Sequence, residues 1–183
     1  MRIAVVGSSG SGKSTLAKRL AAVLDLPAIE LDAINWRPGW KALSTDDPQA
    51  FKNEVTAAVA AEAWITDGNY SAVLPGILAR ATHVVWLDYE RPVIMWRVIT
   101  RSFRRAWTKQ ELWPGTGNRE TFAQWRDPDH PVLWAWRTFH ARRARYEAAF
   151  ASPRLAHLNI IRLRRPREAR PLEARLASGA IRA

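Results

Sequence analysis

The sequence contains no cysteine, which excludes disulfide bonds, thiolate metal sites and thiol-based catalysis. Its four histidines have no spacing typical of metal ligands. No apolar run is long enough to cross a bilayer, and the first predicted strand begins at Arg2, which leaves no room for a signal peptide. With 183 residues and no internal repeat, we expect one domain in a soluble, cytoplasmic protein that has no membrane partner.

Acidic residues are scarce in the second half of the chain. Residues 91–183 contain twenty Lys/Arg and seven Asp/Glu, against eight and ten in residues 1–90, so the halves carry formal charges of +13 and −2. Solvated helix faces account for part of this excess. The rest indicates a polyanionic partner, which is either a triphosphate with a phosphorylated acceptor or the backbone of a nucleic acid. Charge alone leaves both classes open.

Glycine is also sparse, with nine residues, yet three of them fall between positions 7 and 14. This segment reads G-S-S-G-S-G-K-S, which fits the phosphate-loop pattern G-x-x-x-x-G-K-[ST] and follows the apolar run 3–6. Glycine lets backbone amides converge on phosphate oxygens at the positive end of the next helix. Lys13 would reach the β- and γ-phosphates, and the Ser14 hydroxyl would bind Mg²⁺. The pattern predicts ATP and Mg²⁺ binding through Gly7, Ser8, Ser9, Gly10, Ser11, Gly12, Lys13, Ser14 and Thr15.

Strand and helix patterns alternate along the rest of the chain. Short apolar runs predict strands over 2–6, 28–31, 64–66, 83–87 and 158–163. Helical periodicity predicts helices over 13–24, 48–62, 74–80, 92–107, 131–150 and 167–176. This alternation is typical of an α/β fold, a P-loop NTPase three-layer sandwich with a five-stranded parallel sheet and helices on both faces.

Residues 108–131 have the weakest strand or helix pattern in the chain, and they include Pro114, Gly115, Gly117 and Pro128. Its prolines, glycines and charges leave little apolar surface to bury, so we expect a mobile lid that samples open states and closes on a bound triphosphate. Tryptophans flank a Pro-Gly turn at 36 and 40, which predicts one wall of an acceptor pocket. Helical spacing predicts core positions for Trp134, Trp136 and Phe139.

Three aspartates follow predicted strands, where ligands bind in parallel sheets. Asp67 ends W-I-T-D, and Gly68-Asn69 makes a tight exit after it, so we assign the metal site to Ser14 and Asp67. Asp88 also ends a predicted strand, V-V-W-L-D, so the same local pattern makes it the alternative metal ligand. A turn or helix-capping role is open for either.

The chain resembles the small P-loop kinases of the adenylate kinase and shikimate kinase type, and most of all a bacterial subgroup called topology modulation protein or adenylate kinase-like ATPase. Four segments carry the resemblance: G-S-S-G-S-G-K-S-T, L-D-A-I-N-W-R-P-G-W, W-I-T-D-G-N-Y and W-L-D-Y-E-R-P. It implies a central phosphate-loop strand, an acceptor-binding region over about residues 32–63 and a lid after the fourth strand. D-G-N-Y stands where adenylate kinases carry D-G-F-P-R.

Arginines follow the fourth predicted strand. Arg97 and Arg101 lie four residues apart, hence on one helical face. The resemblance implies that Arg97 stacks on the base, that Arg101 clamps phosphate, and that Asp32, at the end of the second strand, acts as a general base or positions the acceptor hydroxyl. On the following helix, Arg137 and Arg142 are favoured over Arg143 as lid arginines that stabilise the transferring phosphoryl group.

Two functions remain open. In the first, the protein transfers the γ-phosphoryl group of ATP to a small acceptor, namely a nucleotide, a nucleoside or another hydroxyl compound. In the second, a regulatory ATPase cycle is coupled to DNA binding by the basic half. The arginine spacing favours the first, and no nucleic-acid-binding module can be identified in the sequence.

Overall fold

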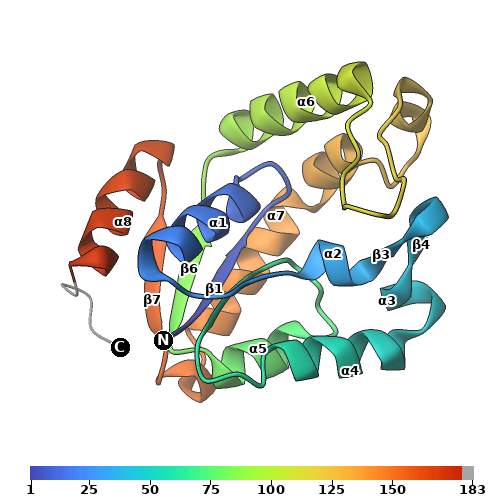
Figure 1. Cartoon of the computed structure of the whole chain (residues 1–183). Coiled ribbons are helices and arrows are strands. Elements are labelled where there is room, and N and C mark those ends of the chain that lie inside the picture. Colours follow the sequence, from blue (N-terminus) through green and yellow to red (C-terminus); the bar gives the residue numbers. More distant parts are fainter. Residues whose placement is uncertain (179–183) are drawn as a thin grey trace.

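The centre of the molecule is a parallel sheet of five strands in the order β2-β5-β1-β6-β7. A computed structural model describes residues 1–178 (Figure 1). The strands are β1 (Arg2–Gly7), β2 (Ala28–Glu30), β5 (Trp64–Asp67), β6 (His83–Leu87) and β7 (Asn159–Leu163), and every pair runs parallel. The phosphate-loop strand β1 therefore lies in the middle of the sheet. The predicted fold class is confirmed.

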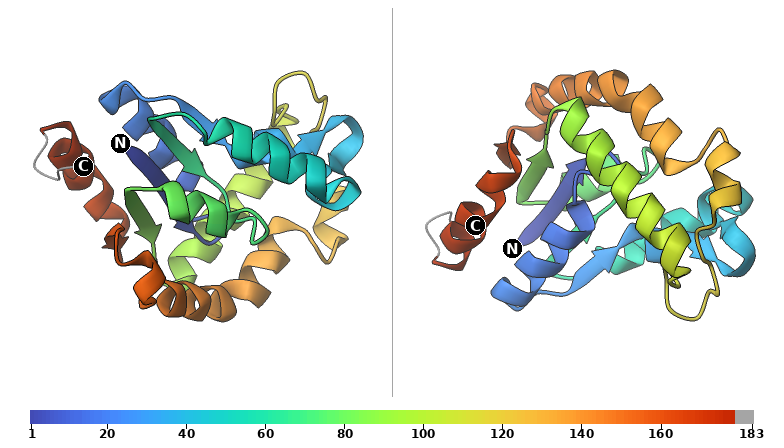
Figure 2. Two further views of the ribbon diagram at one scale, coloured as in Figure 1. Left: turned by 90° about the horizontal axis from the view of Figure 1, so that it is seen from below. Right: turned by 90° about the horizontal axis from the view of Figure 1, so that it is seen from above.

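Helices cover both faces of this sheet (Figure 2). Side chains of β1 alternate between two apolar clusters, with Ile3 and Val5 in one and Ala4 and Val6 in the other. The first cluster includes α1 (Lys13–Leu24), α6 (Arg91–Thr108) and α8 (Ala169–Ala177), and the second includes α4 (Pro48–Ala58) and α5 (Leu74–Arg80). The long helix α7 (Pro131–Phe150) contributes to both. Within residues 1–178, no helix has both the length and the apolarity to cross a membrane.

Most predicted boundaries agree with the structure, and those of α1, α5 and α7 agree at both ends. The helix predicted over 48–62 is α4, which begins at Pro48 after the Asp47 cap and ends at Ala58. Its continuation is prevented because the Trp64 indole and the Arg80 guanidinium both donate to the Val59 carbonyl. The start predicted at 167 is also wrong, since the 3-10 turn η4 (Pro166–Glu168) precedes α8.

The segment after β2 differs most from the prediction. The strand ends at Glu30, and α2 (Leu31–Asn35) begins at once, so Asp32 lies in the first turn of a helix and not at a strand end. A small antiparallel ribbon follows, made of β3 (Trp36–Arg37) and β4 (Lys41–Ala42). The 3-10 turn η1 (Pro38–Trp40) joins its strands, and the short helix α3 (Leu43–Asp46) leads into α4.

The lid segment 108–131 is folded down on this ribbon (Figure 1). The Asn118 side chain accepts from the Trp40 amide at 2.9 Å and donates to the Arg37 carbonyl at 2.9 Å. Trp113 is buried against Trp36 and Trp40, with ring centroids 5.8 and 5.9 Å away. The expectation that the lid has little apolar surface to bury is therefore wrong, because the Trp113 side chain is buried against the two tryptophans of the ribbon.

Two further features order the lid. Glu120 and His130 form a buried pair at 3.0 Å, which ties the middle of the lid to the start of α7. A 3-10 turn, η2 (Phe122–Arg126), lies between them. The lid and the ribbon thus form one unit beside the sheet, and any opening must break the bonds of Asn118.

Replacement of Asn118 by alanine tests this anchor. Asn118→Ala leaves the Trp40 amide and the Arg37 carbonyl without their partner, a loss of about 1–3 kcal/mol. We expect amide hydrogen exchange across residues 108–131 to become about tenfold faster or more, with little change in the sheet.

Asn53→Ala is the matched control, because the Asn53 side chain is exposed on α4 and accepts a hydrogen bond from the nearby Gln49 side chain. It should leave lid exchange unchanged. Equal exchange in both variants would show that Asn118 does not hold the lid.

Candidate active site

The loop between β1 and α1 is shaped by glycines that no other residue could replace. Gly7 has φ 148°, and a Cβ there would lie 2.7 Å from the Leu87 carbonyl oxygen. Gly10 has φ 83°, and its Cβ would lie 2.8 Å from the Val98 Cβ on α6. The backbone thus passes directly against β6 and α6. The loop ends where α1 begins at Lys13, so its amides lie at the positive end of that helix.

Lys13 is the buried cation of this loop. Its Nζ donates to the Ser8 carbonyl at 3.0 Å, which folds the side chain back over the loop. Burial lowers the pKa of Lys13 to about 8, an effect that Asp67 and Asp32 oppose and that Arg142 and Arg101 reinforce. Asp67, Asp32, Arg142 and Arg101 therefore all lie within electrostatic range of Lys13.

Ser14 and Asp67 lie in contact at the head of α1. The Ser14 hydroxyl donates to Asp67 Oδ2 at 2.5 Å. Burial raises the pKa of Asp67, while the Ser14 hydrogen bond and Lys13 oppose the rise. A hydroxyl and a carboxylate are hard oxygen donors of the kind that Mg²⁺ takes alongside substrate phosphates. Within residues 1–178 no cluster of three or more His, Cys, Asp or Glu could hold a metal, so phosphate oxygens would have to complete the coordination.

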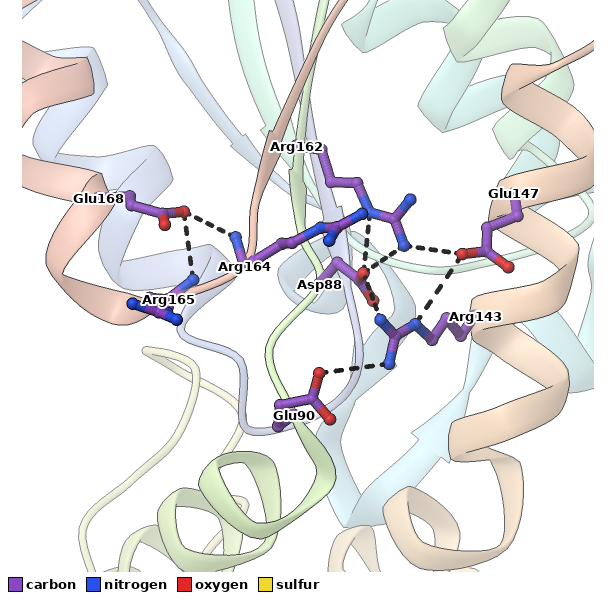
Figure 3. A network of polar contacts seen from close by, with 8 residues as sticks. All are labelled: Asp88, Glu90, Arg143, Glu147, Arg162, Arg164, Arg165 and Glu168. Carbon is purple, nitrogen blue, oxygen red and sulfur yellow. Dashed lines mark hydrogen bonds and ion pairs between the residues drawn. The ribbon is translucent and has the colours of Figure 1, made fainter.

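Asp88 has a different environment (Figure 3). Its Oδ2 accepts from Arg162 at 2.6 and 2.8 Å and pairs with Arg143 at 3.1 Å. Glu147 bonds the same Arg162 at 2.7 Å. A buried carboxylate held by two guanidinium groups joins β6, β7 and α7, so the structure gives Asp88 and Arg143 a shared structural contact.

The two residues after Asp67 and Gly68 make contacts that the sequence analysis missed. Asn69 donates to the Gly7 carbonyl and accepts from the Tyr146 hydroxyl of α7 at 2.8 Å. Tyr70 donates to Asp32 Oδ1 at 2.6 Å. Burial raises the pKa of Tyr70 far above its usual range, so the hydroxyl keeps its proton and remains a donor. The D-G-N-Y segment can be recognised in the sequence, but its contacts could not be predicted, because the partners are 38 to 77 residues away.

Three of the predicted arginines lie at the loop. Arg97 donates to the Ser11 carbonyl at 3.0 Å, with its guanidinium 5.4 Å from the Tyr89 ring centroid. Arg101 lies 3.3 Å from the Ser9 hydroxyl, and its burial lowers its pKa to about 10. Burial also lowers the pKa of Arg142.

Arg101 and Arg142 share a further property: within the described part of the chain, neither buried Nε atom has a hydrogen-bond partner. Arg137 differs, because it donates to the Pro128 carbonyl and lies 3.9 Å from Asp129. The structure therefore brings Arg142, and not Arg137, to the group around Lys13.

Tryptophans divide between the site and the surface. Trp36 and Trp40 lie in edge contact at 5.5 Å and pack with Trp113, so the predicted wall is shared with the lid. Phe139 is buried as predicted, but Trp134 and Trp136 are exposed, and the prediction that they are core residues is wrong. Trp136 lies instead under the Arg91 guanidinium at 4.1 Å.

The fold is similar to that of known kinases, although the chain matches no protein-family model and no curated protein. A shikimate kinase from Acinetobacter baumannii, solved with shikimate, has 19% identity and a TM-score of 0.57 over 100% of this chain and 95% of that one. A shikimate kinase from Bacteroides thetaiotaomicron has 20% identity and a TM-score of 0.53 over 97% and 96%. A putative kinase from Chloroflexus aurantiacus has 15% identity and a TM-score of 0.53 over 96% of each. These likenesses show a shared fold.

The contrast between the two strand-end carboxylates yields a prediction. Asp67→Asn keeps the size of the side chain and removes the charge that a cation needs. We expect the affinity for a non-hydrolysable ATP analogue to fall at least about tenfold in the presence of Mg²⁺, and much less in EDTA.

Asp88→Asn is the matched control. It weakens the bonds to Arg143 and Arg162, so thermal unfolding should occur at lower temperature, with a loss of about 1–3 kcal/mol, while Mg²⁺-dependent binding is retained. If Asp88→Asn loses the Mg²⁺-dependent binding and Asp67→Asn retains it, the metal site belongs to Asp88 and not to Asp67.

Proposed function

We propose that the protein is an ATP-dependent phosphotransferase that moves the γ-phosphoryl group to a small hydroxyl-bearing acceptor. One observation carries the proposal: at the glycine loop Lys13 bonds Ser8, Arg101 bonds Ser9 and Asp67 bonds Ser14, and the charges of Asp32 and Arg142 also act on Lys13. Cations outnumber carboxylates, and two guanidinium groups hold unpartnered Nε atoms. Such an arrangement favours a bound polyanion.

The triphosphate would lie along the loop, with its β- and γ-phosphates at the amides of residues 7–14 and at the Lys13 ammonium. Ser14 and Asp67 would hold Mg²⁺, which neutralises phosphate charge when bound. Arg97 lies on the outer side of the loop, beside Tyr89, where the base of the nucleotide would have a guanidinium plane to stack on. These residues bind and orient the donor.

The transfer itself needs a deprotonated acceptor. In the proposed step, the acceptor hydroxyl oxygen forms a bond to the γ-phosphorus while the bond to the β–γ bridging oxygen breaks and ADP leaves. The hydroxyl proton passes to the Asp32 carboxylate, which Tyr70 orients through its 2.6 Å hydrogen bond. Arg101 and Arg142 stabilise the charge on the phosphoryl oxygens during transfer.

The acceptor would bind between α2 and the lid, in the region of about residues 32–63. The solved shikimate kinase with shikimate supports a small hydroxyl compound, and a nucleotide or nucleoside remains within the same class. The tryptophan wall at 36, 40 and 113 offers a flat apolar side for such a molecule.

The DNA-binding alternative gains no comparable support. Four arginines of the basic half bond within the domain: Arg97 and Arg101 bond the loop, and Arg143 and Arg162 bond Asp88. Part of the +13 charge is therefore used inside the domain and is not offered to a nucleic acid.

The experiment is a screen of hydroxyl metabolites, nucleosides and nucleotides as acceptors with radiolabelled ATP and Mg²⁺. A labelled product that depends on Lys13 supports the proposal. ATP hydrolysis without any labelled acceptor, together with salt-dependent DNA binding, would favour the regulatory ATPase.

The shifted pKa of Lys13 predicts a pH dependence. Only the ammonium form attracts phosphate, and in the free protein it loses its proton near pH 8 and not near 10.5. Affinity for an ATP analogue should therefore fall by roughly 25-fold between about pH 7.5 and 9.5, measured by calorimetry.

Lys13→Arg is the control for this measurement. Its guanidinium keeps its charge across this range, so any residual binding should lack the fall. A wild-type affinity that stays constant to pH 9.5 would contradict the assignment of Lys13 to the phosphates.

The roles of Asp32 and Tyr70 give a second prediction. With an acceptor from the screen, Asp32→Asn should lower kcat by about 10²-fold or more, because it removes the base. Tyr70→Phe should lower kcat about tenfold through loss of orientation. Tyr70→Phe removes no charge and should leave the affinity for the ATP analogue unchanged, and a loss of that affinity would show that Tyr70 supports the donor site instead.

A further inference from the structure

The helix α6 carries apolar side chains on the side that faces solvent. Trp96 is 71% exposed, Ile99 39%, Phe103 51% and Trp107 73%. Their spacing of three, four and four residues places them along one side of the helix. We call these four residues the outer ridge. On the other side of α6, Ile94, Val98 and Ala106 are buried in the domain. The domain's own core therefore does not need the outer ridge.

The ridge extends beyond α6. The Phe103 ring stacks on Trp107 with centroids 6.2 Å apart and meets Phe122 of η2, also exposed, at 5.5 Å. Phe103, Arg104 and Trp107 line an open hollow beside it. Contiguous exposed aromatic surface of this kind indicates an interaction site, whereas single exposed apolar residues do not.

The helix that carries the ridge has ionisable side chains of one sign only. Residues 91–110 contain six Lys/Arg and no Asp/Glu. Arg97 and Arg101 face the phosphate loop, but Arg104 is exposed and lines the same hollow as Phe103 and Trp107, and Lys109, also exposed, caps the end of the helix. A partner must therefore be negatively charged at its surface and able to receive aromatic side chains.

Two occupants fit poorly. A second copy of the chain would bring two proteins of net charge +11 together and would oppose two helices that carry no carboxylate. A single-stranded nucleic acid stacks its bases on ring faces, and Phe103 and Trp107, which stack on one another with an interplanar angle of 13°, each have one face covered. An anionic bilayer meets both requirements, because its headgroups attract arginine and lysine and its interface accepts tryptophan.

We propose that the outer ridge, with Arg104 and Lys109 beside it, docks the protein on an anionic lipid bilayer surface. The binding is peripheral: α6 lies along the edge of the molecule (Figure 1) and the ridge enters only the headgroup region, to a depth of about 5–10 Å. The expectation of no membrane partner rested on the absence of a spanning apolar run, and an interfacial helix is less apolar than a span. The proposal is independent of the proposed phosphotransfer.

The test is co-sedimentation of the full chain with vesicles of phosphatidylcholine alone or mixed with phosphatidylglycerol. We expect binding to the mixed vesicles only, weakened by added salt. Trp96→Ala combined with Trp107→Ala should lower the vesicle partition coefficient at least about tenfold. Arg104→Glu should lower it about fivefold or more.

Arg154→Glu is the matched control, because it makes the same change in net charge at an exposed residue of η3 (Pro153–Leu155), and Leu155 packs on the other face of the sheet. It should change binding less than about twofold. Far-ultraviolet circular dichroism and ATP-analogue affinity confirm that each variant is folded.

Several results would overturn the proposal. One is absence of binding to mixed vesicles, and another is equal binding by the double tryptophan variant. A dimer in sedimentation equilibrium that the double variant loses would assign the ridge to a second copy. Retention on a single-stranded oligonucleotide that the variant loses, without vesicle binding, would assign it to nucleic acid.

Discussion

The phosphate loop and the proposed acceptor carboxylate depend on one short segment, Asp67 to Tyr70. Asp67 accepts from Ser14 at the far end of the loop, Asn69 donates to Gly7 at its beginning, and Tyr70 donates to Asp32 on α2. Gly68 makes this possible, since it has φ 145° and a Cβ there would lie 2.7 Å from Leu31 Cβ. The proposed donor and acceptor sites are thus aligned by four consecutive residues at the end of β5, the strand next to β1.

Charge burial explains why such a site favours an anion over an empty state. Lys13, Arg101 and Arg142 all have pKa values lowered by burial, which means that the folded protein holds their charges at a cost. Asp32 and Asp67 offset that cost only in part, because Tyr70 and Ser14 already occupy oxygens of these carboxylates. A polyphosphate supplies the missing negative charge and the missing acceptors together.

The parts that the sequence predicts well are those encoded locally. The loop pattern lies within eight residues, and the sheet follows from short apolar runs, so both could be predicted. Asp67 and Asp88 could not be separated by local pattern, because what distinguishes them is Ser14 beside one and Arg143 and Arg162, 55 and 74 residues away, beside the other. The same limit applies to Asn118, whose partners Arg37 and Trp40 lie about eighty residues earlier. Helical spacing also gave the wrong burial for Trp134 and Trp136, because periodicity shows which residues share a helix face but not whether that face is buried.

Helix α6 links the glycine loop between β1 and α1 to the surface. On its inner side, Gly10 approaches Val98 without room for a side chain, and Arg97 and Arg101 bond loop atoms. On its outer side it carries the aromatic ridge. Because a helix moves as a rigid element, a surface that holds the ridge also constrains the two arginines relative to the loop. If that surface prefers the α6 position found with bound nucleotide, the nucleotide must strengthen surface binding by the same factor by which the surface strengthens nucleotide binding.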